Sequence, residues 1–506
     1  MSARNQIGIG DRGSGWKFFG RFISWRAGRR LLVALALVGT LVAVVYVVED
    51  WRGRRAWDRC RRELEARGEK LNWEAFVPAS VPTESNFFKA PGMTAWFSKQ
   101  ASATNRNVRL FSVTPSDTRG WPLTLEELRA LPEDRVSGST NNLSRAELRE
   151  RFAELETEYK TLAVACARAQ SRLGDDYRVP LTVDIPNFAR ARSAAQSLSV
   201  HANLNLLDER PDVALADLAM MRRLADAMAE NQTLVGTMIG VAIMGLHVET
   251  ARAALDAGLW KEPQLAAIQA QILDFNLLGA FARSIRWAER AGGLWLLERP
   301  RTELEQVLNL APLGGGSPGG INWNAAFTRL GLRLCPRGWI RQNQATLARS
   351  EQDLLDGFDP ALGRIHARRL TAVGTDIAER NGGFTPYGFL AAMATPNFIR
   401  ALQTLARIQT QIDQLEVACA LERHRLAHGS YPEKLELLAP AYLNRVPGDL
   451  FADRTLQYTR DGQGQYRLWS VGWNEKDDGG LPSLGRDGKP DYGDGDGDWV
   501  WTSKRP

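Results

Sequence analysis

An uncharged run of eighteen residues, Leu31 to Val48, constrains the fold of this chain more than any other stretch. A helix rises about 1.5 Å per residue, so a helical run of this length extends roughly 27 Å, close to the hydrocarbon thickness of a bilayer. A cleavable signal peptide has a shorter apolar core with a small-residue cleavage site behind it, whereas charged residues from Glu49 to Arg52 follow this run. The run therefore predicts an uncleaved, single transmembrane helix at residues 31–48. A buried core helix is the alternative interpretation.

The charges that flank the run predict which side of the membrane each part of the chain occupies. Lysine and arginine near a span set its orientation, while acidic residues contribute little. Six basic residues between Arg12 and Arg30 precede the run and seven follow it up to residue 67, so the count near the run is nearly balanced. Arg29 and Arg30 adjoin its first end, Glu49 and Asp50 its second, and long domains translocate largely regardless of charge. We expect residues 1–30 to form a cytoplasmic tail and the main body to lie outside the inner, cytoplasmic membrane.

The net charge of +6 belongs to the membrane flanks rather than to the body. Residues 1–70 hold fifteen basic and seven acidic residues, whereas the remainder holds 49 and 51. Basic flanks suit the anionic headgroups of a lipid bilayer. A nucleic-acid-binding protein would need basic residues clustered on a folded domain, so we expect no nucleic-acid partner.

The cysteines are too far apart in the sequence for a common metal or redox motif. None forms a C-x-x-C pair, which argues against a zinc site or a thioredoxin-like motif. In an oxidising compartment four cysteines allow three pairings, and the sequence does not choose among them. These residues are Cys60, Cys166, Cys335 and Cys419.

Helical patterns dominate the middle of the chain. Residues 49–122 predict a solvated juxtamembrane helix followed by an extended, proline-rich segment, and residues 123–390 predict an α-helical body. One long helix is expected from Ser144 to Leu173. A helical hairpin is expected at 188–230, where Pro211 opens the second helix at a first-turn position. This hairpin resembles a tetratricopeptide-type helix pair, which implies a helical-repeat-like body, although three units at a 34-residue period are not present.

A second apolar stretch, Leu234 to Val248, is fifteen residues long and uncharged. A transmembrane helix needs about twenty residues, so we expect this stretch to be the buried central helix of the body, with a second span as the alternative. Gly236 and Gly240 are four residues apart and would let a neighbouring helix approach closely. The glycine-rich loop at 314–320 lacks the Lys-Ser/Thr ending of a phosphate-binding loop, which argues against a nucleotide site.

The last part of the chain, residues 391–506, predicts a small α+β module. A long helix is expected from Thr395 to His428, with Gly429 as its left-handed cap. A β-hairpin is expected across 456–471, followed by a loop rich in glycine and aspartate. Three features follow one another in this module. They are the helix ending ALERHRLAHGSYP at 420–432, the Leu, Pro and Tyr-Leu positions of 435–447, and the strand ending in Trp-Ser-Val-Gly at 472. This arrangement resembles the C-terminal part of the major pseudopilin of type II secretion systems.

The resemblance implies a long helix packed on a short antiparallel sheet outside the cytoplasm, with calcium bound in the loop after the last hairpin strand. It also implies side-by-side assembly through an N-terminal helix. The chain departs from the family because its span lies some 350 residues before this module. Pseudopilin precursors are cut after a glycine directly before the span, with a glutamate shortly after the cut. Here Gly28 is followed by Arg29, Arg30 and an uncharged run, so we expect an uncleaved protein that does not polymerise on its own.

An acidic loop supplies the candidate metal site. Hard oxygen ligands at alternating positions suit calcium, but the loop lacks the glycine and the distal glutamate of an EF-hand, so a solvated acidic turn is the alternative. His424 and His428 are spaced as a metal pair on a helix, but no third ligand is evident, and we expect two exposed helix-end histidines. The candidate calcium ligands are Asp477, Asp478, Asp494, Asp496 and Asp498.

The fold expected from these patterns is mainly α, with one transmembrane helix, a helical body and a small C-terminal α+β module. The expected role is binding or scaffolding with protein partners of the cell envelope, in a secretion or pilus-like system. No G-x-S-x-G or H-E-x-x-H motif is present. The alternative is a hydrolase-like envelope enzyme whose site is assembled from scattered residues of the helical body. A charged cleft with shifted pKa values would favour the enzyme, and an apolar groove would favour docking.

Overall fold

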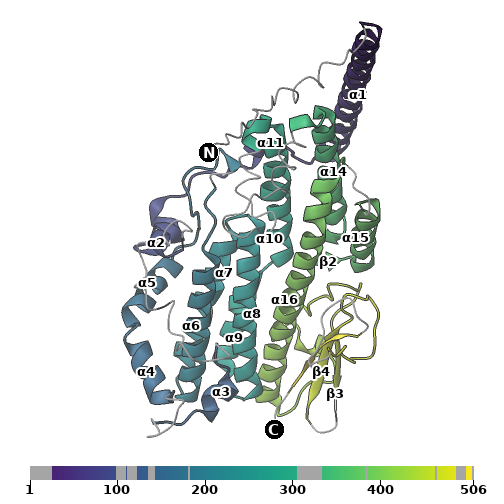
Figure 1. Ribbon diagram of the computed structural model, residues 1–506. Helices are drawn as coiled ribbons and strands as arrows, with labels where there is room; N and C mark the ends of the chain where they lie inside the picture. The colour runs from purple at the N-terminus through teal and green to yellow at the C-terminus, as the bar shows by residue number, and fades with distance from the viewer. Residues whose placement is uncertain are drawn as a thin grey trace, which may run out of the picture.

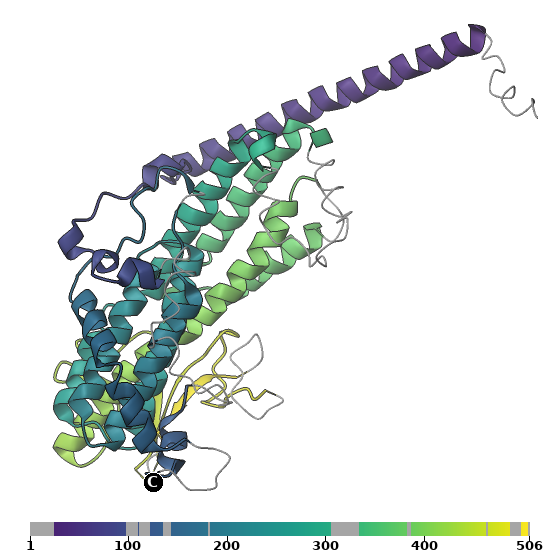
Figure 2. The same cartoon turned by 60° about the vertical axis from the view of Figure 1, so that its left-hand side comes forward.

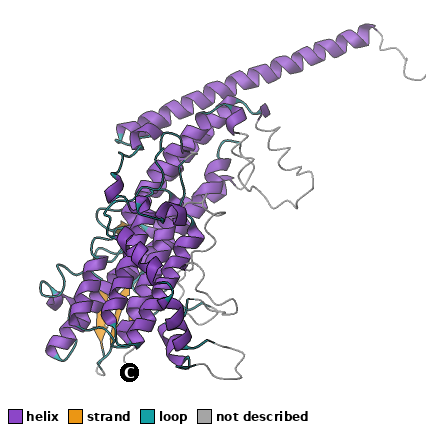
Figure 3. Cartoon of the chain, turned by 90° about the vertical axis from the view of Figure 1, so that its left-hand side faces the viewer, coloured by secondary structure: helices purple, strands orange, loops and turns teal. Residues whose placement is uncertain are grey.

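The computed structural model of the protein is mainly helical (Figure 1). Helices account for 64% of it and strands for 6%, which confirms the mainly α class with a small C-terminal antiparallel sheet. The strands of the C-terminal sheet lie at the end of the body away from the protruding first helix (Figure 3). The structure describes residues 25–97, 110, 122–134, 143–180, 183–304, 333–381, 386–461, 464–485 and 497–503.

Helix α1 (Trp25–Ala66) is one continuous helix of 42 residues whose first half stands clear of the body (Figure 2). The side chains of the apolar run are exposed along their whole length, as in Leu32 at 69% and Val47 at 67%. Within the described residues, three helical stretches are long and apolar enough to cross a membrane. Two of them, 234–256 and 262–298, are 61% buried in the body, whereas the apolar window of α1 is not buried at all. An N-terminal apolar helix compatible with membrane anchoring is therefore present.

The second half of α1 is solvated on one face only, which corrects the expectation of a solvated helix from Trp51 to Lys70. It packs along α14 (Arg337–Leu355), and Trp57, Cys60 and Leu64 are buried there. These residues recur at helical spacing, so they form one apolar stripe between charged residues that face solvent. The alternation of arginine and glutamate describes only the outer face of this helix.

The segment after α1 lies across the body in short turns and buries its aromatic residues, as expected. Phe87 and Phe88 are fully buried, and Asn86 accepts a hydrogen bond from the backbone N–H of Arg172 at 2.8 Å. Up to Phe97 the described residues of this segment form the short elements η1 (Trp73–Phe76), η2 (Thr83–Ser85), η3 (Phe87–Lys89) and α2 (Met93–Phe97).

The first helices of the body differ from the single long helix expected between Ser144 and Leu173. The chain leaves helical geometry at Leu155, whose side chain is buried at 2% exposure, so two shorter helices form. The elements are α3 (Leu125–Ala130), α4 (Arg145–Ala153) and α5 (Glu156–Cys166).

A bundle of longer helices forms the centre of the body. Pro211 occupies the first turn of its helix, as predicted. A Cβ atom on Gly236 would lie 2.6 Å from the carbonyl oxygen of Met228, and one on Gly240 would lie 2.9 Å from that of Ala225, so both glycines permit the close helix approach that their spacing predicted. The bundle contains α6 (Phe188–Leu207), α7 (Pro211–Ala229), α8 (Leu234–Asp256) and α9 (Glu262–Ile272), with α8 packed against α6, α7 and α16.

The part of the body nearest to α1 is built from segments far apart in the sequence. A π-helical turn, η7, joins two α-helices here; such turns are rare and occur often at functional sites. The elements are α10 (Leu277–Ser284), η7 (Ile285–Ala291), α11 (Gly292–Glu298), α14, the strand pair β1 (Phe358–Asp359) and β2 (Arg364–Ile365), and α15 (Ala367–Asn381).

The C-terminal module is organised by α16 (Phe389–His428), which begins six residues before the expected Thr395 and ends at Gly429, whose φ of 80° is the predicted left-handed cap. One side of α16 packs on α8 and α9, and the other packs on the sheet. The sheet has the order β3-β4-β5 and is antiparallel throughout. The module contains η8 (Leu435–Leu438), β3 (Gln457–Arg460), β4 (Tyr466–Ser470) and β5 (Trp499–Thr502).

Candidate functional site

Three of the five predicted calcium ligands lie close together in the C-terminal module, and their carboxylates organise the loop itself. Asp498 accepts backbone N–H groups of Gly480 at 2.6 Å and of Asp478 at 3.1 Å. Asp477 accepts the indole N–H of Trp469 at 3.1 Å, and Asp478 accepts the ammonium of Lys476 at 2.7 Å.

Asp494 and Asp496 lie outside the described residues, so the structure does not place the remaining two candidate ligands. Among the residues that it does describe, no group of three or more histidine, cysteine, aspartate or glutamate side chains is arranged to hold a metal ion. Calcium binding at this loop stays a prediction.

A groove of about 450 Å³ crosses the body between α6, α8, α16 and β5. Its charged lining holds three arginines, Arg192, Arg252 and Arg407, and one carboxylate, Glu249. The guanidinium of Arg252 lies 4.2 Å from the ring centroid of Trp501, a cation–π contact. This groove suits an anionic ligand better than a cationic one, and it contains no nucleophile next to a base.

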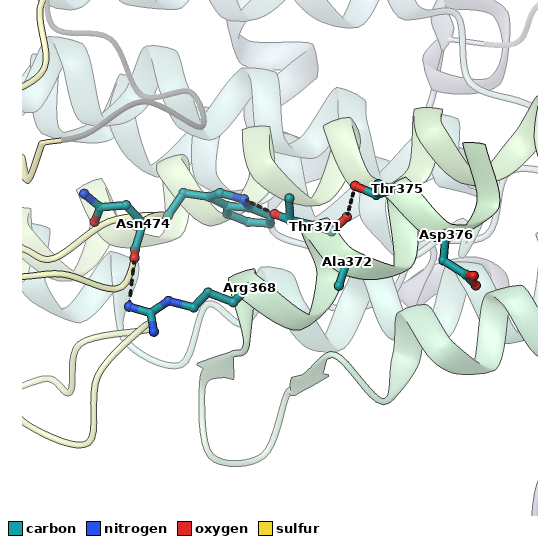
Figure 4. A pocket seen from close by; sticks show the side chains of 7 residues that line it. Arg368, Thr371, Ala372, Thr375, Asp376 and Asn474 are labelled. Atoms are coloured by element: carbon teal, nitrogen blue, oxygen red, sulfur yellow. Dashed lines mark hydrogen bonds between the residues drawn. The ribbon is translucent and has the colours of Figure 1, made fainter. Parts of the chain in front are cut away.

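A second cavity of about 530 Å³ lies where α15 meets the C-terminal module (Figure 4). The indole N–H of Trp473 donates to the hydroxyl of Thr371 at 3.2 Å, and Arg368 donates to the carbonyl of Asn474 at 3.4 Å. Figure 4 shows these side chains bridging the helix and the loop. Most polar groups at this cavity therefore hold two elements together.

The histidines have structural partners. His247 is fully buried, and burial lowers its pKa to about 4, so the ring is neutral. His201 lies 2.7 Å from a carboxylate oxygen of Asp217 and stacks on the ring of Tyr159. His424 hydrogen-bonds the carbonyl oxygen of Ser430 at 2.9 Å beside the end of α16. A His–Asp pair orients an imidazole for catalysis only if a nucleophile is within reach. The ring of His201 contacts Asp217 and the rings of Phe152 and Tyr159.

The raised pKa of Asp413, on α16, leads to a prediction about the stability of the fold. Burial raises its pKa to about 8, with the carboxylates of Glu416 and Asp449 adding to the rise, although Gln409 donates to it at 3.0 Å. A raised pKa costs stability above the ordinary value of 3.8, because the unfolded chain ionises and the folded chain does not. Asp413→Asn is therefore expected to raise the free energy of unfolding by about 2 kcal/mol at neutral pH.

The gain should disappear as the pH falls to the ordinary aspartate value, where the side chain is protonated in both states. Urea unfolding of the full chain at several pH values measures it. A variant that is less stable than the wild type at neutral pH would contradict the expected protonation of Asp413.

The backbones of α1 and α14 approach each other very closely where the two helices meet, and we call this contact the junction. A Cβ atom on Gly338 would lie 1.9 Å from the carbonyl oxygen of Glu49, and one on Gly53 would lie 2.2 Å from the carbonyl oxygen of Gly338. Real Cβ atoms are essentially never this close to backbone atoms. The two helix backbones are therefore in direct contact, and only glycine fits at either position.

Polar contacts fix this junction at the first turn of α14. The backbone N–H of Gly338 donates to Asp50 at 2.7 Å, and the indole of Trp339 donates to Glu49 at 3.1 Å. Carboxylates are favourable at a helix N-terminus because its first N–H groups lack partners within the helix. Tyr46, in the last turn of the apolar run, donates to the carbonyl oxygen of Leu334. The residues at the end of the expected span thus bind the body directly.

A buried ion network closes the other end of the junction. Arg290, on η7, is fully buried and pairs with Glu69, which follows α1, and its guanidinium also donates to Gln352 of α14 at 2.8 Å. Arg286 lies 3.3 Å from the same carboxylate. Burial alone would raise the pKa of Glu69, but the two arginines outweigh it and the pKa is lowered. Glu69 is therefore ionised at neutral pH.

Glu351 of α14 has the opposite behaviour beside the same arginine. Its side chain is buried, and burial raises its pKa well above the usual 4.5 despite the nearby charge of Arg290. Burial thus disfavours the charged form of Glu351, whereas Glu69 is the carboxylate that pairs with Arg290.

Sequence reasoning missed the junction. Gly53 was a detectable signal, because glycine is unfavourable within a helix by about 1 kcal/mol and needs a packing reason there. The pairing of Glu69 with Arg290 had no local signal, because 221 residues separate them. The four cysteines are free thiols, and Cys60 and Cys419 are buried.

The junction gives the body a defined position relative to the apolar helix, whereas the groove and the cavity give no defined chemistry. Comparison of this chain with known proteins gave no match: no protein-family model, curated protein or solved structure matches it.

Proposed function

We propose that this chain is a single-pass membrane protein of the cell envelope whose body is a binding or scaffolding platform held at the membrane. The observation that carries the proposal is the continuity of α1. Its exposed apolar half suits a bilayer, and its second half is docked on α14 through backbone contact at Gly53 and Gly338. A flexible tether would serve for simple retention at a membrane, whereas a docked helix fixes the height and the orientation of the body.

The proposed orientation places the N-terminal tail in the cytoplasm and the body outside the inner membrane, because Arg29 and Arg30 adjoin the start of the apolar run. Protease added to the outer side of intact inner-membrane preparations should then remove the body and spare the tail. A cytoplasm-specific reporter fused after Pro506 should be inactive. An active reporter would reverse the orientation, and recovery of the protein in the soluble fraction would reject the anchor.

The proposed partners are the lipid bilayer and other envelope proteins, in a secretion or pilus-like system. The support is the arrangement of α16 on the three-stranded antiparallel sheet, with the helix cap at Gly429, which the resemblance to the major pseudopilin implied. Copurification after chemical cross-linking in membranes tests this part of the proposal. Partners drawn only from the cytoplasm would contradict it.

Calcium is proposed as a ligand of the loop from Asp477 to Asp498. The support is the position of Asp477, Asp478 and Asp498 at one turn, where calcium would neutralise carboxylates whose repulsion adds, after burial, to the raised pKa of Asp498. A tenfold excess of calcium over its dissociation constant would stabilise the fold by about 1.4 kcal/mol. The melting temperature of the full chain should therefore rise in calcium relative to chelator.

The double change of Asp494 and Asp496 to asparagine should abolish this rise, while magnesium at the same concentration should give little effect. A melting temperature that does not respond to calcium would leave the loop as an acidic turn.

A further inference from the structure

The end of the body beside α1 carries arginine and tryptophan side chains from two segments far apart in the sequence. Residues 295–301 follow from α11, and residues 333–341 lead into α14; together we call them the interfacial patch. Both segments lie beside the point where α1 leaves the body (Figure 1). The patch contains five arginines and one glutamate, so its charge is strongly positive although the body as a whole is nearly neutral.

Two contacts fix the position of the patch along the axis of α1, relative to the apolar run. Tyr46 lies in the last turn of the run and donates to the carbonyl oxygen of Leu334 in the patch. Four residues further along the patch, Gly338 touches the backbone of Glu49, the first residue after the run. If residues 31–48 cross a bilayer, the patch therefore lies at the level of the headgroups.

The chemistry of the patch matches this position. Leu334 is 59% exposed, and the guanidinium of Arg299 lies 3.9 Å from the ring centroid of Trp295. Arg301 donates to the carbonyl oxygens of Arg333 and Cys335, which joins the two segments. Tryptophan is enriched at membrane–water interfaces, and arginine pairs with phosphate through a planar set of donors.

Two carboxylates border the patch, and each already has a partner. Glu49 is paired with Arg52 at 2.7 Å, and Asp50 accepts the backbone N–H of Gly338 at 2.7 Å. Arg333 and Arg337 are both exposed on the surface of the patch. Phosphate groups at the membrane surface can therefore reach both side chains.

We propose that the interfacial patch binds the headgroups of anionic phospholipids, so that the body rests on the membrane surface in addition to being anchored by α1. This inference rests on the proposed function, because it needs residues 31–48 to span the bilayer. It does not depend on which side of the membrane the body occupies.

The test uses the full chain reconstituted in bilayers of phosphatidylcholine mixed with phosphatidylglycerol. Native mass spectrometry of the released protein gives the ratio of the two lipids that remain bound. We expect the wild type to retain phosphatidylglycerol preferentially. The double variant Arg333→Gln/Arg337→Gln should lower this preference roughly fivefold for each arginine removed, and the corresponding double lysine variant should largely keep it.

Arg129→Gln/Arg210→Gln is the matched control, because it removes the same charge at the end of the body around α3, opposite to α1 in Figure 1. It should leave the lipid ratio unchanged. The proposal is overturned if the control lowers the ratio as much as the patch variant, or if neither the wild type nor the lysine variant prefers phosphatidylglycerol. A melting curve of each variant shows that the comparison is made on folded protein.

Alkaline extraction tests separately whether the protein is anchored in the membrane, as the proposed function requires. If it is not anchored, alkaline extraction would release the wild type from membranes. If the wild type resists extraction but lacks a lipid preference, the anchor stands and the lipid-binding patch is rejected.

Discussion

Replacing Gly338 with alanine is expected to lower the free energy of unfolding by about 3 kcal/mol, although alanine normally stabilises a helix by about 1 kcal/mol relative to glycine. The added Cβ atom would lie 1.9 Å from the carbonyl oxygen of Glu49. Because this atom belongs to the backbone, no side-chain rotation relieves the contact, and α1 must move away from α14. The buried contacts of Trp57, Cys60 and Leu64 would then be weakened as well.

Thermal and urea unfolding of the full chain in detergent measure this effect, and limited proteolysis in the second half of α1 reports its release from the body. Gly39→Ala is the matched control on the same helix, because nothing lies within 4 Å of a Cβ atom at that position. It should be neutral or slightly stabilising. Equal behaviour of the two variants would show that the helices do not touch as described.

Replacing Glu69 with glutamine is expected to destabilise the protein by about 3–5 kcal/mol at neutral pH, because it leaves the charge of Arg290 buried without its carboxylate. The side chain of Arg290 is fully buried, and that of Glu69 is only 13% exposed. The lowered pKa of Glu69 gives the sign of the pH dependence. Its contribution is present above the ordinary value of 4.5 and is lost as the pH falls through the folded value.

The wild type should therefore lose stability in acid more steeply than Glu69→Gln does. Glu63→Gln provides the matched control, since Glu63 pairs with Arg349 across the same junction at 3.2 Å while both side chains are about half exposed. Exposed ion pairs contribute about 0–1 kcal/mol, so this variant should be close to the wild type. If the two variants are equally destabilised, burial of Arg290 is not what makes Glu69 important.

The parts of the fold that follow from local patterns were predictable. The apolar run, the proline that opens α7, the paired glycines of α8 and the left-handed cap at Gly429 each depend on a few neighbouring residues. The break at Leu155 was missed because helical periodicity continues on both sides of it, and only tertiary packing draws the side chain inward. The start of α16 was placed late because proline is tolerated in the first turns of a helix, so Pro396 suggested a start that lies further upstream.

The candidate site was less predictable because it is formed by contacts between distant segments. The aspartates of the C-terminal loop are conspicuous in the sequence, but Asp477 and Asp498 bind backbone N–H groups of their own loop. The junction, in contrast, depends on glycines and on one buried arginine. Their roles become visible only when residues 49–69 lie beside residues 286–352. The composition of a charged helix does not reveal that one of its faces is packed against the body.

Hydrogen exchange along α1, measured by mass spectrometry on the full chain in bilayers, tests most directly the claim that one continuous helix both crosses the membrane and carries the body. The account predicts slow exchange from residue 31 to residue 64 without interruption, since lipid protects the first half and α14 protects the second. Gly338→Ala should speed exchange after residue 49 and leave 31–48 protected. Fast exchange at residues 49–55 in the wild type would mean that a flexible tether joins the span to the body, and it would contradict the claim of one continuous helix.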